Sequence, residues 1–240
     1  FENTISFQGR CQLSKQRSLL AEILLQKSNL PRPCKYSTFG CLHEEEIQEL
    51  PKHEEDCNFR TVHCPDPECT EKRLEKDIVP HLIKEHLILP EEMEKNSNLD
   101  KCIWILEDCD YIQRTYDRTW PLSPFKCENV IFFSVLMKSC HDHLWYAWIY
   151  TLGSSKTASQ FRCQVHLQSF NDPEESLTYK GQPHSLDKSG QQVKTSGALV
   201  MSDEMVKNMV KEMSNEQKLE GEQDQLKFLL SIDYIVEKIK

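Results

Sequence analysis

Cysteine and histidine residues recur at regular spacing between positions 34 and 86 of this 240-residue chain, and this spacing constrains the fold most strongly. The first set follows the pattern Cys-x6-Cys-x11-His-x3-Cys, and the second follows Cys-x4-Cys-x11-His-x4-His. The members are Cys34, Cys41, His53 and Cys57 in the first set, and Cys64, Cys69, His81 and His86 in the second. Two consecutive complete sets with the same central gap indicate two metal-binding sites rather than scattered free thiols.

Thiolate and imidazole groups in sets of four are the donors that Zn²⁺ binds in a tetrahedron. In each set we expect two ligands from a turn and two from a helix. Gly40 gives the backbone of the first turn the freedom it needs before Cys41. His53 and Cys57 are four residues apart, which predicts that they share one helical face. The longer step from His81 to His86 requires that helix to loosen at its end. Because four protein ligands leave no open position, the sequence predicts two structural Zn²⁺ ions and no catalytic metal.

The pattern changes after residue 98, where short apolar or alternating runs are separated by turn signals. This predicts strands at 102–107, 129–138, 143–152, 161–169, 176–180, 199–201 and 227–236. Turns are predicted at 171–173 and 188–190, and a helix capped by Ser202 is predicted to run to Met213. Strands this short and evenly spaced favour an antiparallel sandwich in an α+β, mainly β, chain.

Three regions follow from these patterns. Residues 1–33 form an N-terminal segment with a predicted helix at 12–30, residues 34–89 form the tandem fingers, and residues 95–240 form the sandwich. A polar linker is predicted at 90–98 and a solvated acidic loop at 214–225. Zinc removal is expected to unfold 34–89 and to leave most of the β-structure intact.

Composition narrows the classes of function. The formal net charge of −9 argues against nucleic acid as the partner, since binding to phosphates needs a basic face. No apolar run approaches the ~20 residues of a membrane-spanning helix. Eleven cysteines without a signal peptide indicate a reducing compartment, so we expect a cytoplasmic or nuclear protein. Because the chain begins with Phe1, we expect it to be a fragment of a longer protein.

Three stretches of the finger region resemble the Siah (seven-in-absentia) family. They are PCKYSTFGC at 33–41, HEEDCNFR at 53–60 and VPHLIKEH at 79–86, and a weaker resemblance continues through 177–185. Members of this family are E3 ubiquitin ligases with a RING, two zinc fingers and a TRAF-like sandwich that binds peptides and dimerises. The resemblance therefore implies a TRAF-like fold for 95–240 and protein partners for the chain.

The N-terminal segment departs from the family pattern. The resemblance places the last RING ligand at Cys11 and a further ligand at Gln8, which cannot bind zinc as a cysteine does. No other cysteine or histidine precedes Cys11. We therefore expect residues 1–33 to be a degenerate RING remnant and the chain to be non-catalytic by itself.

The resemblance also implies a peptide-binding edge strand, matched here by residues 119–125. It places the peptide site near Leu99, Trp104, Trp120 and Leu122. Pro121 and Pro124 each remove a backbone donor, which weakens the addition of a peptide strand.

Three functions remain open at this stage. The first is a Siah-type module that recognises proteins in the ubiquitin–proteasome pathway, without RING activity of its own, and forms a homodimer or a heterodimer with a related chain. The second is the substrate-recognition fragment of an active RING ligase whose RING lies upstream of Phe1. The third is a nucleic-acid-binding zinc-finger protein. Cys140, His141 and His143 are interpreted as a polar hairpin turn rather than a metal or thiol site.

Overall fold

The computed structural model describes residues 31–94, 96–107, 117–214 and 227–239. The predicted helix at 12–30, Gln8 and Cys11 lie outside the described residues, as does nearly all of the predicted loop at 214–225. The chain divides into two compact units, residues 1–54 and 55–240, which are described separately. None of the described helices is long and apolar enough to cross a bilayer.

The first finger is built from short elements. Strand β1 (Arg32–Pro33) pairs antiparallel with β2 (Glu44–Glu45), and the 3₁₀ turn η1 (Ser37–Phe39) lies between them. Gly40 ends this turn with a left-handed φ of 105°, which confirms the predicted role of the glycine. Helix α2 (Leu50–Glu55) carries His53 but ends before Cys57, so the predicted shared helical face is wrong. The chain turns instead at Cys57, whose carbonyl accepts the N–H of Arg60 at 2.9 Å.

The second finger is a hairpin followed by a helix. Strands β3 (Thr61–His63) and β4 (Lys72–Leu74) pair antiparallel, and η2 (Glu75–Asp77) leads into α3 (Ile78–Glu85). The helix ends at His86, and Leu87 is left-handed with φ 55°, so the predicted loosening at this end is confirmed. Residues 90–98 were expected to be a linker, but Pro90 instead begins the short helix α4 (Pro90–Met93), which buries Met93.

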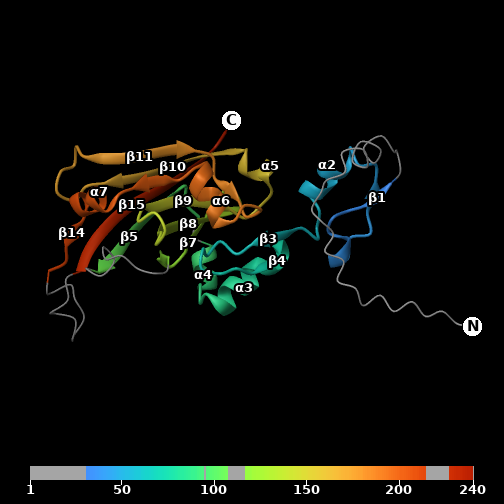
Figure 1. The fold of residues 1–240 in the computed structure, drawn as a ribbon, viewed down its shortest axis with the longest axis horizontal. Coiled ribbons are helices and arrows are strands. Elements are labelled where there is room, and N and C mark those ends of the chain that lie inside the picture. The colour runs from blue at the N-terminus through green and yellow to red at the C-terminus, as the bar shows by residue number, and fades with distance from the viewer. Residues whose placement is uncertain (1–30, 95, 108–116, 215–226, 240) are drawn as a thin grey trace, which may run out of the picture. The chain divides into compact units, whose positions relative to one another are not determined.

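Two β-sheets form the body of the second unit (Figure 1). In the five-stranded sheet, β15 (Lys227–Lys238) pairs with β10 (Phe161–Gln168), β14 (Lys211–Glu212) and β5 (Leu99–Glu107), and β10 pairs with β11 (Ser176–Gly181). In the six-stranded sheet, β9 (Trp145–Thr151) pairs with β8 (Val130–Lys138), β12 (His184–Ser185) and β13 (Leu199–Met201). Strands β6 (Arg118–Thr119) and β7 (Ser123–Cys127) both pair with β8. Only the β12–β9 pairing is parallel among the described strands, and all seven predicted strands are present.

Three short helices connect these strands: α5 (Ser155–Ala158), α6 (Gly190–Ser196) and α7 (Asp203–Met209). The Ser202 hydroxyl accepts the N–H of Met205, as the predicted cap requires. The helix ends at Met209 rather than Met213, because Val210 is extended and the next two residues pair with β15. At 188–190, Ser189 is the N-cap of α6, so the predicted turn is the start of a helix.

The first hydrophobic core lies between the two sheets. Strands β5 and β15 contribute alternate residues from the five-stranded sheet, among them Trp104 and Tyr234. Strand β9 contributes Trp145, Ala147 and Ile149 from the other sheet. This alternation is the expected packing of two antiparallel sheets face to face.

A second core covers the opposite face of β8 and β9. The other residues of β9, including Tyr146, Trp148 and Tyr150, pack there with Ile78 and Leu82 of α3. Strands β8 and β9 are therefore buried on both faces, which explains why their sequences are apolar without alternation. The second zinc finger and the sandwich share one core.

Arg60 adds a polar connection across the same junction. Its side chain is only 3% exposed, and its two terminal nitrogens lie 2.6 Å from Asp187 Oδ1 and 2.7 Å from Glu75 Oε1. Glu75 belongs to the second finger, whereas Asp187 follows β12 of the sandwich. The N–H of His63 also donates to the carbonyl of Leu186 at 2.8 Å.

Candidate metal centres

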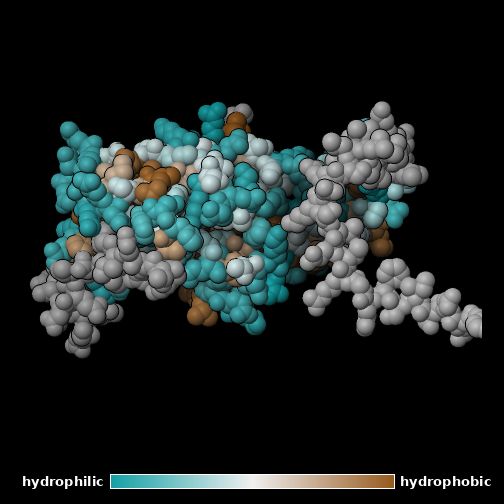
Figure 2. Space-filling model, in the orientation of Figure 1, coloured by the Kyte–Doolittle hydropathy of each residue, from teal (hydrophilic) through white to brown (hydrophobic). Residues whose placement is uncertain are grey.

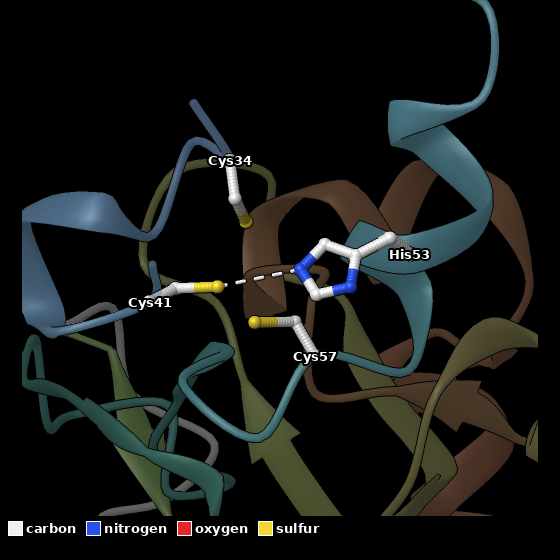
Figure 3. Close-up of side chains that lie close together, drawn as sticks. All are labelled: Cys34, Cys41, His53 and Cys57. Carbon is white, nitrogen blue, oxygen red and sulfur yellow. Dashed lines mark hydrogen bonds between the residues drawn. The ribbon is translucent and has the colours of Figure 1, made fainter. Parts of the chain in front are cut away.

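The first predicted ligand set comes together in the structure (Figure 3). The donor atoms of Cys34, Cys41, His53 and Cys57 all lie within 4.8 Å of one another. Cys41 Sγ lies 3.3 Å from His53 Nε2, and all three cysteines are buried. Tetrahedral zinc bonds of about 2.0–2.3 Å place neighbouring ligand atoms about 3.3–3.8 Å apart. The first set therefore fits a zinc ion.

The local backbone supports this first centre. The N–H of Tyr36 donates to Cys34 Sγ at 3.5 Å, and the N–H of Phe59 donates to Cys57 Sγ at 3.4 Å. Such amide donors favour the thiolate form that zinc binds. The ring of His43 stacks on the ring of His53, with centroids 3.8 Å apart. His43 therefore supports a ligand and is not a member of the set.

The second predicted set also comes together, and its donors face a common centre. Cys64 Sγ lies 3.3 Å from His86 Nε2, and Cys69 Sγ lies 3.6 Å from His81 Nε2. The two Nε2 atoms are 3.3 Å apart. These distances match the edges of a zinc tetrahedron. Both histidines therefore present Nε2 to the centre and leave Nδ1 free for outer contacts.

Two carboxylates lie against these outer nitrogens. Asp66 Oδ2 is 2.8 Å from Nδ1 of His86, and Glu71 Oε2 is 3.5 Å from Nδ1 of His81. The cysteine spacing gave no indication of these outer carboxylates, although each acid stands two residues after a cysteine of the set.

Burial sets the protonation of the second set. Desolvation raises the pKa of the Cys64 thiol, although the backbone amide of Asp66 opposes this. Desolvation lowers the pKa of His81, and the neighbouring His86 lowers it further. The imidazole of His81 is therefore ready to bind a cation, whereas the thiol of Cys64 needs zinc to release its proton.

A third group of possible donors does not form a closed set. Asp117, Cys140 and His141 lie close together at the β8–β9 turn. The carboxylate of Asp117 already accepts the N–H of Cys140 at 2.8 Å and lies 3.3 Å from Lys194 Nζ. Lys194 supplies the positive charge here, and the segment forms the hairpin turn that the sequence predicts.

The four predicted peptide-binding residues are placed differently from one another. Trp120 is 6% exposed, stacks on Trp145 with centroids 5.1 Å apart and donates its indole N–H to the carbonyl of Ile105. Trp104 is buried in the same core, and Leu122 packs against the second core. Of the four, only Leu99 is exposed, at 39%. The peptide site remains a prediction.

Comparison with known proteins agrees with this geometry. The Sina zinc finger family matches residues 26–98. The chain is 28% identical over 186 residues to the "Probable E3 ubiquitin-protein ligase sinah" of Drosophila melanogaster, covering 74% of this chain and 48% of that protein. It is also 28% identical over 186 residues to the "E3 ubiquitin-protein ligase sina" of Schistosoma mansoni, covering 74% of this chain and 45% of that protein.

The chain thus spans about half the length of the curated relatives that it matches. Its two Cys/His clusters, both within or beside the matched finger region, are compatible with two zinc ions. The finger match over residues 26–98 and the similarity to the two relatives support the resemblance to the Siah (seven-in-absentia) family that the sequence indicates.

Proposed function

We propose that this chain is a Siah-type protein-interaction module of the ubiquitin–proteasome pathway, which recognises protein partners and dimerises without RING activity of its own. The observation that carries the proposal is the shared core between the second finger and the sandwich. Both ligand sets are complete with four protein donors, so their zinc ions stabilise structure rather than react. The relatives, which are named E3 ubiquitin ligases, support the pathway.

The edge of β5 is the proposed site for a partner peptide. Among the described strands, β5 pairs only with β15. The carbonyl of Ile105 faces away from β15, since it accepts the indole N–H of Trp120. Because backbone groups alternate in direction along a strand, Lys101 and Ile103 face the same open edge. An extended peptide can pair there, and Leu99 would contact its side chains.

The outer face of the five-stranded sheet is the proposed dimer surface. Neither core cluster of the described residues forms on this face, whereas the second finger covers the outer face of the other sheet. Leu99, Ile103 and Ile105 are 39%, 55% and 47% exposed on β5. Lys101 stands opposite Asp233 of β15 at the middle of this apolar stripe. A second copy related by a two-fold axis can place the same stripe against it.

Light scattering at tens of micromolar tests the dimer. We expect the mass of a dimer for the wild type and of a monomer for Ile103→Lys. Leu87→Lys is the control, since Leu87 is 81% exposed on the second finger, where Figure 2 shows an apolar patch near α3 and α4. A monomeric wild type, or equal effects of both substitutions, would count against the proposed surface.

Binding of proline-containing extended peptides, measured by fluorescence polarisation, tests the edge. Ile103→Pro removes a backbone donor from the open edge, so it should abolish binding. Ile103→Lys keeps that donor and should retain binding. Peptides that bind both variants equally would place the site elsewhere.

The alternative is that the chain is the recognition part of an active RING ligase whose RING precedes Phe1. An assay of ubiquitin transfer with a standard E2 separates the two functions. The proposed module should form no ubiquitin chains, whereas a longer protein with an active RING should form them. Nucleic-acid binding is disfavoured by the charge of −9, and a steeply salt-dependent affinity for duplex DNA would be needed to support it. We also propose a cytoplasmic or nuclear location, which fractionation of cells can check.

A further inference from the structure

The two ligand sets differ in the charge that they bring to zinc. Three thiolates and one neutral imidazole leave the first centre with a net charge of −1 around Zn²⁺, whereas two thiolates and two imidazoles leave the second centre neutral. The second set is therefore poorer in anionic donors. The residues around the ligands differ in the opposite sense, because acidic side chains lie against the histidines of the second set.

Asp66 lies in the knuckle between the two cysteines of the second set, and both of its carboxylate oxygens have partners. Oδ2 lies 2.8 Å from His86 Nδ1, and Oδ1 accepts the N–H of Glu68 at 2.9 Å. The carbonyl of Asp66 accepts the N–H of Cys69 at 3.1 Å. With its side chain 23% exposed, the carboxylate is held in one orientation by the same turn that places a zinc ligand.

Glu71 has a similar but weaker arrangement. Its Oε2 lies 3.5 Å from His81 Nδ1, and its backbone carbonyl accepts the N–H of Cys64 at 3.0 Å. The same oxygen also binds Arg73, whose Nε is 2.9 Å away, and the side chain is 47% exposed. Arg73 therefore competes with His81 for this carboxylate.

The first centre has no such carboxylate on its histidine among the described residues. The ring of His53 stacks on His43, and it is His43 that lies 2.8 Å from Glu45. The first centre has its extra negative charge among its ligands, and the second has carboxylates just outside them.

We propose that Asp66 and Glu71 are positioning residues of the second zinc centre. Asp66 lies within hydrogen-bond distance of His86 Nδ1, and accepting that proton fixes Nε2 toward the metal and raises its basicity. Glu71, 3.5 Å from His81 Nδ1, acts on that ligand through its charge. Together they supply the negative charge that a third thiolate supplies in the first centre. Asp66 contributes more, because it is closer, more buried and not shared with an arginine.

Removing such an outer carboxylate typically costs 10–100-fold in metal affinity. We expect Asp66→Asn to weaken the second site by that amount, while Glu71→Gln weakens it by a few-fold. Glu85→Gln is the matched control. It removes one negative charge beside His86, and the ion pair that Glu85 forms is with the exposed Lys84, at 2.6 Å. It should leave the affinity unchanged.

The experiment titrates the full chain with Co²⁺ and then displaces it with Zn²⁺ against a competing chelator. Thiolate-to-cobalt absorption separates the two centres, since one has three thiolates and the other two. Circular dichroism at saturating zinc checks that each variant is folded. Loss confined to the second centre, in the order Asp66→Asn, Glu71→Gln, Glu85→Gln, supports the proposal.

An equal effect of Asp66→Asn and Glu85→Gln would overturn the proposal, because general charge would then explain the loss. An equal loss at both centres would also overturn it. If Asp66→Asn does not fold, the variants of the exposed Glu71 and Glu85 still test the proposal. It requires Glu71→Gln to lower the metal affinity of the second centre more than Glu85→Gln does.

Discussion

The two fingers share the same spacing between their second and third ligands, yet they differ in what surrounds the metal. In the first finger, helix α2 buries only Leu50 among its residues. In the second, α3 buries Ile78 and Leu82 completely, and both belong to a core shared with β8 and β9. Ligand spacing thus identifies a metal site without showing what the module packs against.

This difference changes the expected response to zinc removal. The sequence predicts that removal of zinc unfolds both fingers and leaves the sandwich folded. Because Val62, Cys64 and Ile78 belong to the second core, loss of the second zinc withdraws support from one face of β8 and β9. The sandwich should therefore depend on the second zinc.

The largest effect on stability should come from replacing a single zinc ligand, tested separately at each centre. The wild type should hold two zinc equivalents, and Cys41→Ser and Cys64→Ser should each hold one, by elemental analysis. A structural zinc site is worth on the order of 10 kcal/mol. Among the described residues, Cys64 of the second site belongs to the core shared with the sandwich and no ligand of the first site does. Cys64→Ser should therefore lower the sandwich melting temperature strongly, and Cys41→Ser should leave it nearly unchanged. Equal sandwich melting temperatures for Cys41→Ser and Cys64→Ser would contradict the difference between the two fingers.

Truncation of a buried leucine in each helix sharpens the same comparison. Leu82→Ala should destabilise the sandwich by about 2–5 kcal/mol, because it opens a cavity in the shared core. Leu50→Ala should change the sandwich transition by much less. Urea unfolding followed by near-UV circular dichroism measures both, and a larger effect of Leu50→Ala would contradict the account.

Arg60 should show the next largest effect. Replacement by Met leaves Glu75 and Asp187 without their buried partner, and breaking a buried pair costs about 3–5 kcal/mol. Both carboxylates are about one-third exposed, at 31% and 34%, so we expect about 3 kcal/mol. Arg162→Met, at an exposed position on β10, is the control for loss of an arginine and should cost little. Equal unfolding midpoints of Arg60→Met and Arg162→Met in urea would show that the contacts of Arg60 with Glu75 and Asp187 do not stabilise the fold.

Tyr146 should give the smallest effect, through pH. Burial and then the hydrogen bond to Asp142, at 2.6 Å, raise the pKa of Tyr146 to about 12. An unfolded tyrosine titrates near 10, so this contribution is complete below about pH 10 and is lost as pH rises toward 12. Between pH 9 and 11 the wild type should lose roughly 1 kcal/mol more than Tyr146→Phe. Parallel losses in urea unfolding would show that Tyr146 is not responsible.

Local patterns in the sequence predicted most of the elements and the two Cys/His clusters that the structure brings together. Strands β5 and β10 alternate clearly, and ligand spacing is fixed by coordination. The errors arose where tertiary contacts decide. Met213 lies beyond the end of α7, because the preceding residues pair with β15. Cys57 lies beyond the end of helix α2 and begins a turn to Arg60.

The attachment of the second finger was not predicted, although the sequence carries a signal for it. Residues 145–151 are apolar on both faces, which requires a second covering layer. What forms that layer cannot be deduced from the strand itself. The burial of Trp120 was missed for the same reason, since its partners Trp145 and Ile105 are distant in sequence.

Hydrogen exchange of the β9 amides, before and after chelation of zinc, tests the central claim most directly. If the second finger and the sandwich share one core, Tyr146, Trp148 and Tyr150 should lose protection together with α3 when zinc is removed. Cys41→Ser should keep that protection while its second site is filled. Full protection of β9 after complete removal of zinc would contradict the account.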